Sequence, residues 1–267
     1  MSQSYLPFLG YGGNNSSPLE TDLLVLNPTF LWEASHTSPD VYVDNDNFAT
    51  WRDRVVGRIL SSDGLTPVKY KTNILNGLPV ARFNAGIGAS FSAGIDTTSF
   101  SFLNKDSHTI IIVFKMDAAL ANNQTLINNN SERGTVSGIS VRNRTSDNHY
   151  VYFLSNQTTG NTNNFVTHTQ PVVYGVFHIL ALRFENGKVG DDFTMNIDGD
   201  QQTDERDNPP ENAANTYEFK LGVRANFSDT PHNWLGGDIA TVGLWNSALN
   251  DTDFARAIQI MKNKYNL

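Results

Sequence analysis

The sequence contains no cysteine. Disulfide bridges, thiolate metal sites and cysteine nucleophiles are therefore excluded. We also expect no secretory signal, because the first residues lack a basic start and Pro7 and Gly10 interrupt their apolar patch. Both features fit assembly in a host cytoplasm, and an extracellular destination reached by another route, such as cell lysis, is the alternative.

Long apolar runs and positive charge are also scarce. The longest apolar stretch, residues 110–114, has the length of a strand, whereas a membrane helix needs ~20 apolar residues. The formal net charge is −8, from 19 Lys and Arg against 27 Asp and Glu. Nucleic-acid binding requires clustered cations, so we expect neither membrane insertion nor a nucleic-acid partner.

Large aromatic residues and asparagine are plentiful. The 267 residues include 16 Phe, 9 Tyr and 4 Trp, which is enough to fill the space between two facing sheets. All-β domains often reach this length undivided. Asparagine tolerates left-handed backbone and forms Asx-turns, so its clusters, such as residues 128–130, indicate many tight loops.

Short runs rich in Val, Ile, Phe, Tyr and Thr alternate with Gly, Asn, Asp and Pro clusters, a pattern typical of strands. Residues 193–197 alternate apolar and polar side chains, and Asp198-Gly199 then predicts a hairpin turn. We expect strands at residues 29–33, 80–83, 90–91, 109–116, 125–128, 138–142, 150–155, 172–184, 192–197, 218–223 and 237–245. The fold class is therefore all-β, an antiparallel sandwich.

The two ends of the chain differ from this pattern. Five apolar residues recur at helical spacing near the C-terminus: Phe254, Ala257, Ile258, Met261 and Tyr265. With Asn250 as N-cap they predict an amphipathic helix at residues 251–264. Residues 1–28 instead predict an extended arm before a domain at 29–267, because the Gly, Asn and Ser of residues 12–18 cannot form a core. Four apolar residues at its start are expected to dock on a partner: Tyr5, Leu6, Phe8 and Leu9.

Several segments resemble the concanavalin A-like lectin and glucanase superfamily, of the laminin-G-like jelly-roll kind. The closing strands of that fold are similar to FKLG at residues 219–222, WLGGDIA at 234–240 and LWNSALND at 244–251, and a helix with Lys264-Tyr265 follows. Earlier elements are similar to LWEAS at 31–35, FATWRD at 48–53, NGLPVARFN at 76–84 and FHILA at 177–181. The resemblance implies a jelly-roll sandwich over nearly the whole chain after the arm.

This superfamily includes lectins, glucanases, adhesion modules and many virus and phage structural proteins, so the fold alone does not give the function. Its retaining glucanases carry an E-x-D-x-x-E strand with two carboxylates ~5–5.5 Å apart. No two of the glutamates here bracket an aspartate on a predicted strand. We therefore expect no catalytic residues and no enzyme activity, and a glucanase-type glycoside hydrolase is the least favoured alternative.

Two acidic turns are candidate calcium sites, since hard cations bind several oxygen ligands. One holds Asp44 and Asp46, and the other Asp198 and Asp200. Neither follows the EF-hand pattern, and a turn with Asx hydrogen bonds is the alternative interpretation. No other cofactor is predicted.

Sugar binding uses an exposed aromatic face with planar polar neighbours. Trp32, Trp51 and Trp245 lie in signature elements and are predicted to be core, which leaves Trp234 as the candidate platform. Its loop also supplies Asp229, His232 and Asn233, and a second candidate loop supplies Arg142, Arg144 and Tyr150. Hairpin loops without a ligand are the alternative for both.

The sequence thus favours a non-enzymatic virion structural protein, such as a capsid fibre, decoration or tail-fibre component. The arm would dock on other virion or assembly proteins, and the lectin-like domain would face outward toward a cell-surface glycan; a homo-oligomer is compatible with this arrangement. A free carbohydrate-binding lectin is the alternative.

Overall fold

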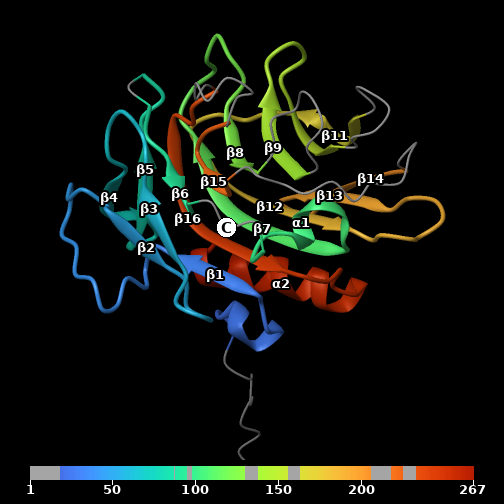
Figure 1. Cartoon of the computed structure of the whole chain (residues 1–267), viewed down its shortest axis with the longest axis horizontal. Helices are drawn as coiled ribbons and strands as arrows, with labels where there is room; N and C mark the ends of the chain where they lie inside the picture. Colours follow the sequence, from blue (N-terminus) through green and yellow to red (C-terminus); the bar gives the residue numbers. More distant parts are fainter. Residues whose placement is uncertain are drawn as a thin grey trace, which may run out of the picture.

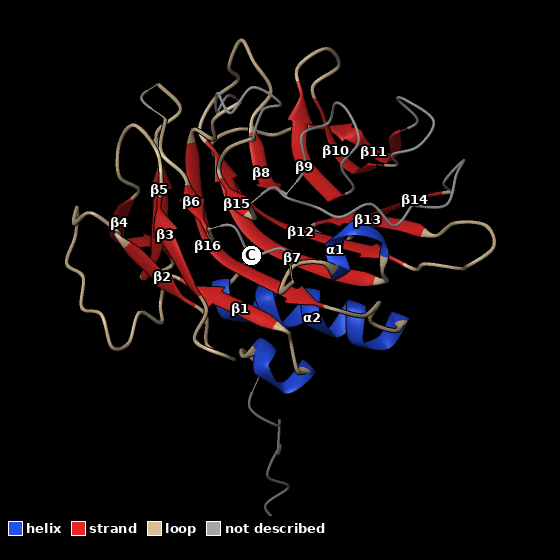
Figure 2. Ribbon diagram, viewed as in Figure 1, coloured by secondary structure: helices blue, strands red, loops and turns tan. Residues whose placement is uncertain are grey.

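The structure, a computed structural model, describes residues 19–86, 88–94, 98–129, 138–155, 163–205, 218–224 and 233–267. Two antiparallel sheets face each other, and a C-terminal helix packs outside one of them (Figures 1 and 2). This arrangement confirms the predicted β-sandwich. No helix among the described residues is both long and apolar enough to cross a membrane.

The first sheet, called here the helix-covered sheet, runs in the order β14-β13-β12-β7-β16-β5-β4, and β1 also pairs with β16. Its strands are β1 (Phe30–Glu33), β4 (Lys69–Leu75), β5 (Leu78–Phe83), β7 (His108–Met116), β12 (Phe177–Phe184), β13 (Phe193–Ile197), β14 (Asp200–Asp204) and β16 (Gly237–Trp245). The second sheet runs in the order β11-β10-β9-β8-β15-β6-β3-β2. Its strands are β2 (Thr50–Arg52), β3 (Ile59–Ser62), β6 (Phe91–Ser92), β8 (Thr125–Asn128), β9 (Gly138–Arg144), β10 (His149–Ser155), β11 (Asn163–Pro171) and β15 (Lys220–Leu221).

Strand β7 shows why the sequence folds into these layers. Successive side chains of a strand point to opposite faces of the sheet. Ile110, Ile112 and Phe114 accordingly join the core between the sheets, whereas Ile111 and Val113 pack beneath the C-terminal helix. Both faces of β7 are covered, so it reads in the sequence as a continuous apolar run.

Helix α2 (Asp251–Tyr265) confirms the predicted C-terminal helix. The Asn250 side chain accepts a hydrogen bond from the Asp253 backbone amide at 2.9 Å, which caps the first turn. The predicted stripe of five apolar residues is buried against the sheet. The helix ends at Tyr265, where Asn266 adopts a left-handed conformation.

The described part of the predicted arm lies on the domain. A 3-10 turn, η1 (Leu23–Leu26), packs beside α2 with Leu23 and Leu26 buried. The indole nitrogen of Trp245 donates to the Leu26 carbonyl at 2.8 Å. Tyr5, Leu6, Phe8 and Leu9 lie outside the described residues.

Most predicted strands are present, with two kinds of difference. Residues 172–176 do not continue β12, because the chain turns at Gly175, whose φ is 80°. Strands β2, β3, β4, β11 and β14 were not predicted from the sequence, and a further short helix, α1 (Phe102–Lys105), precedes β7. β14, for example, reads DQQTD and lies at a sheet edge with only partial burial, so it carries no apolar alternation.

Candidate functional site

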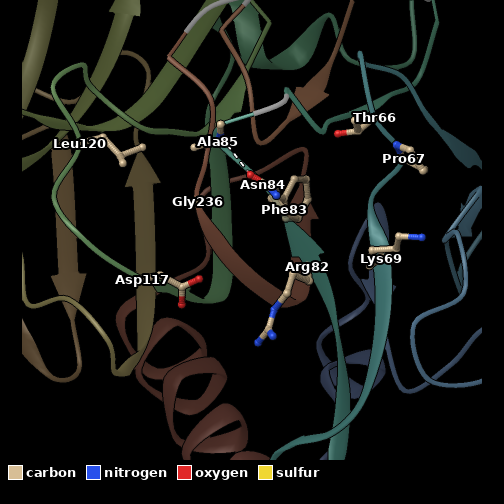
Figure 3. Close-up of a pocket in the computed structure, with 11 residues that line it drawn as sticks. Thr66, Pro67, Lys69, Arg82, Phe83, Asn84, Ala85, Asp117, Leu120 and Gly236 are labelled. Carbon is tan, nitrogen blue, oxygen red and sulfur yellow. Dashed lines mark hydrogen bonds between the residues drawn. The ribbon is translucent and has the colours of Figure 1, made fainter.

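A hollow with a volume of about 550 Å³ lies where β4, β5, β7 and β16 meet their connecting loops (Figure 3). We call it the main cavity. Its walls combine apolar and polar groups: Thr66, Pro67, Lys69, Arg82, Phe83, Asn84, Ala85, Gly86, Asp117, Leu120 and Gly236. The mixture of C–H surfaces with a few planar polar groups is typical of small-molecule sites.

A row of charged side chains crosses the sheet beside this cavity. Arg82 on β5 is directly opposite Asp238 on β16, and Asp238 is directly opposite Lys115 on β7. Arg82 binds Asp238 through two hydrogen bonds of 2.7 and 2.8 Å, and the Lys115 ammonium lies 3.0 Å from the same carboxylate. Lys115 also lies 2.9 Å from Asp117, so four charges form one chain of contacts.

The pKa values of the two cations reflect this pairing. The hydrogen bonds that the Arg82 guanidinium donates to Asp238 raise its pKa. Burial lowers the pKa of Lys115, but hydrogen bonds to Asp117 and Asp238 outweigh that effect, and its pKa is raised overall. Both groups therefore stay charged at neutral pH, so the row beside the cavity keeps its alternating charges.

Gln124 holds the loops of the cavity together. It is fully buried, its side-chain oxygen accepts from the Gly236 amide at 2.9 Å, and its nitrogen donates to the Ala118 carbonyl at 2.8 Å. Asn84 adds a local turn, since its side-chain oxygen accepts from the Gly86 amide at 3.0 Å (Figure 3). Internal hydrogen bonds of this kind preorganise the cavity walls.

Trp234, the predicted sugar platform, is half-buried and braces a loop. Its ring fits against Gly88, where an added Cβ would lie 2.8 Å from the indole. The ring thus packs on the segment that follows Asn84–Gly86 rather than standing free. The Asn233 carbonyl accepts from the Thr125 amide at 3.1 Å, whereas Asp229 and His232 lie outside the described residues.

The second candidate loop requires a correction. Arg142 and Tyr150 belong to strands β9 and β10, and both are buried, Tyr150 at 1% exposure. Tyr150 faces the core because alternation along β10 directs it inward, against the Phe114 ring. Arg144, the last residue of β9, is the one partly exposed member, and it forms an ion pair with Asp147. These residues do not form a single exposed sugar site.

The carboxylates of the first acidic turn accept hydrogen bonds from the protein or form an ion pair with it. Asp44 accepts from the Thr72 amide at 3.0 Å and pairs with Lys71 at 3.0 Å, and Asp46 accepts from the Val43 amide. These bonds match the turn interpretation.

The Asp198 carboxylate accepts from the Ile179 amide at 2.7 Å and contacts His178 Nδ1 at 2.6 Å. Asp200 lies two residues further on, at the start of β14. Over the described ranges no cluster of three or more His, Asp or Glu side chains is arranged to hold a metal ion.

The principal residues of the main cavity escaped the sequence analysis. The segments that contain Arg82, Asn84 and the adjacent Asp238 indicated only the fold. One signal lies in the sequence: Arg82 has the same strand parity as Val80, which places an arginine on a face that is otherwise apolar.

A family model for the concanavalin A-like lectin/glucanases superfamily matches residues 88–255. Comparison with curated proteins finds no match. Among solved structures, the binding domain of botulinum neurotoxin DC in complex with SialylT is similar with a TM-score of 0.57 at 11% identity, covering 82% of this chain and 51% of that one. This chain thus spans about half the length of that toxin domain.

Two further structures are similar. Domain 4 of AbnA, a GH43 extracellular arabinanase from Geobacillus stearothermophilus in complex with arabinotriose, gives a TM-score of 0.56 at 14% identity, covering 80% of this chain and 98% of that one. Trypanosoma rangeli sialidase in complex with sialic acid gives 0.54 at 11% identity, covering 88% and 32%. At these identities the likeness shows the fold alone.

Proposed function

Because the chain belongs to the concanavalin A-like lectin/glucanases superfamily, we propose that it is a non-enzymatic, carbohydrate-binding protein whose ligand occupies the main cavity. The observation that carries the proposal is the cavity itself, a hollow of about 550 Å³ with an apolar wall and a polar rim at the loop end of a lectin-like sandwich. The similar toxin and arabinanase domains, whose structures contain SialylT and arabinotriose, support this ligand class.

The chemistry of the walls suits a sugar. Sugar rings present hydroxyl groups at their edges and C–H groups on their faces. Asn84, Arg82 and Asp117 offer amide, guanidinium and carboxylate groups for the hydroxyls, while Pro67 and Leu120 offer apolar surface. The volume lies within the range of roughly 300–1,000 Å³ typical of small-molecule sites, which is adequate for an oligosaccharide.

The acidic groups support binding rather than hydrolysis. Hydrolysis by the usual glycosidase route needs two carboxyl groups placed across the scissile bond. Among the described residues that line the cavity, Asp117 is the single acid. The nearby Asp238 is fully buried and is held by Arg82 and Lys115, so it is not available as a proton donor or nucleophile.

A glycan array followed by calorimetry tests the proposal. Lys69→Met and Asp117→Asn each remove one exposed charge from the rim, and both should weaken the glycan bound by the wild type by about threefold or more. Lys188→Met is the matched control, because it removes a similarly exposed lysine from the β12–β13 connection, where it pairs with Glu185. Equal affinity in all four proteins would contradict the proposed location, and release of sugar from the bound glycan would contradict the non-enzymatic role.

We further propose the virion setting predicted from the sequence, with the arm as the docking segment and a free lectin as the alternative. Deleting residues 1–18 leaves η1, which packs on α2, in place. The shortened protein should keep the circular dichroism spectrum and glycan affinity of the full chain but no longer co-sediment with the native particles. Unchanged co-sedimentation would contradict docking through the arm.

A further inference from the structure

A second, smaller cavity lies on the other side of the sandwich, where strands β10 and β11 of the second sheet approach the β13–β14 turn. Its volume is about 220 Å³, and its polar walls are Tyr150, His168, Gln170, His178, Asp198 and Asp200. None of these residues lines the main cavity. Figure 1 shows β11 and β14, the edge strands of the two sheets, on the same side of the molecule.

Tyr150 and Tyr152 on β10 show why this cavity is distinctive. Both face inward, and at most 1% of either residue is exposed. The Tyr152 hydroxyl is hydrogen-bonded to His108 Nε2. The Tyr150 hydroxyl is buried and, within the part of the chain that the structure describes, has no hydrogen-bond partner. A buried hydroxyl without a partner is costly, so a group in the cavity is the natural partner for it.

The hydrogen-bond partners of the two wall histidines define which ring nitrogens donate and which accept. His178 Nδ1 lies 2.6 Å from the Asp198 carboxylate and Nε2 lies 2.9 Å from the Val173 carbonyl, so both nitrogens donate and the ring is a cation. His168 Nδ1 accepts from the Gln170 amide at 3.2 Å while Nε2 donates to the Asp200 carbonyl at 3.2 Å, so this ring is neutral. The positive charge of His178 neutralises that of Asp198, so the Asp200 carboxylate leaves the cavity wall with a net negative charge.

We propose that this cavity is a second ligand site, which binds an uncharged polyhydroxylated molecule of the size of one sugar ring. The Tyr150 hydroxyl, the Asp200 carboxylate and the Gln170 amide supply the acceptors and donors that several neighbouring hydroxyl groups require. The excess carboxylate opposes anions. The volume is below the range of drug-sized ligands, which favours a monosaccharide over an oligosaccharide.

Saturation-transfer NMR with glucose, galactose, mannose and glycerol tests this site. At least one of the four should bind the wild type, and Tyr150→Phe should weaken that binding by about three- to tenfold, the effect of one hydrogen bond. Tyr150→Phe should also melt at or above the wild-type temperature, because its hydroxyl has no described protein partner. Tyr152→Phe is the matched control: it loses the bond to His108, and should melt lower while binding the sugar as the wild type does.

The proposal is independent of the main cavity, so Lys69→Met should leave monosaccharide binding here unchanged. Absence of binding by all four probes would overturn it, as would equal binding by wild type and Tyr150→Phe. A lower melting temperature for Tyr150→Phe would show that its hydroxyl bonds to the protein instead. Calcium binding that Asp200→Asn abolishes, with no sugar binding, would assign the cavity to a cation.

Discussion

The guanidinium of Arg82 and the carboxylate of Asp238 meet across β5 and β16 through two hydrogen bonds, although 156 residues separate them in the sequence. Asp238 is fully buried, while 35% of the Arg82 side chain is exposed at the rim of the main cavity. The pair therefore links the stability of the helix-covered sheet to the shape of the proposed sugar site.

Arg82→Met should lower the free energy of unfolding by about 2 kcal/mol, because a buried carboxylate loses its bidentate partner while partial exposure of the arginine limits the cost. Urea denaturation measures the change. Arg144→Met is the control: its partner Asp147 is 35% exposed, whereas Asp238 is fully buried, so a loss below about 1 kcal/mol is expected. Equal losses in the two variants would show that the Arg82 pair contributes no more to the free energy of unfolding than the Arg144 pair does.

Gly237 is required by the close approach of β16 to β7. A Cβ at this position would lie 1.9 Å from the Lys115 carbonyl oxygen, so the backbone must move to accept any side chain. Gly237→Ala should therefore cost about 3 kcal/mol in urea denaturation. Gly86→Ala, whose Cβ would lie 3.4 Å from the Asn84 side chain, should change stability by no more than about 0.5 kcal/mol. A Gly237→Ala protein as stable as the wild type would refute this close pairing of β16 with β7.

His178 should make stability decline at alkaline pH. Burial lowers its pKa, but the hydrogen bonds to Asp198 and the Val173 carbonyl outweigh burial and raise it above the usual 6.5. A raised folded pKa stabilises the protein fully below the unfolded value, and this contribution is lost as pH rises through the folded value. Urea midpoints measured from pH 6 upward should fall for the wild type, and fall less for His178→Asn. Parallel slopes in the two proteins would contradict the ion pair.

His108 should act in the opposite direction at acidic pH. Full burial lowers its pKa from 6.5 to about 4, so the folded protein holds it neutral against the Tyr152 hydroxyl. Stability should fall as pH drops from about 6.5 toward 4, by about 3 kcal/mol at most. His108→Gln should be less stable at neutral pH but should show a shallower acid slope. If stability falls with decreasing pH as steeply in His108→Gln as in the wild type, a group other than His108 takes up the proton.

The sequence predicted the elements whose side chains alternate between two environments. Residues 125–128 and 237–245 match β8 and β16, and α2 extends one residue beyond its predicted end, because apolar periodicity and the Asn250 cap are local signals. β4 and β14 escaped prediction, since edge strands are partly exposed and polar. Tyr150 was predicted both to begin a strand and to belong to a candidate loop site, because its polar neighbours in the sequence hide its inward direction.

The main cavity was beyond sequence reasoning for a different physical reason. Its residues come from β4 and β5, from the loops that precede β4 and β16 and from those that follow β5 and β7, and the pairing of the strands brings them together. A single sequence gives strand parity, which places Arg82 on a face, but it does not give the strand order that places Asp238 opposite. Trp234 was predicted as an exposed aromatic platform, yet it is half-buried against Gly88, which belongs to a distant segment.

A crystal structure of the protein with the glycan of highest affinity on the array tests the central claim most directly. The account predicts sugar density in the main cavity, within hydrogen-bonding distance of Arg82, Asn84 or Asp117 and in contact with Leu120. A glycan bound outside this cavity, with Arg82, Asn84 and Asp117 untouched, would contradict it.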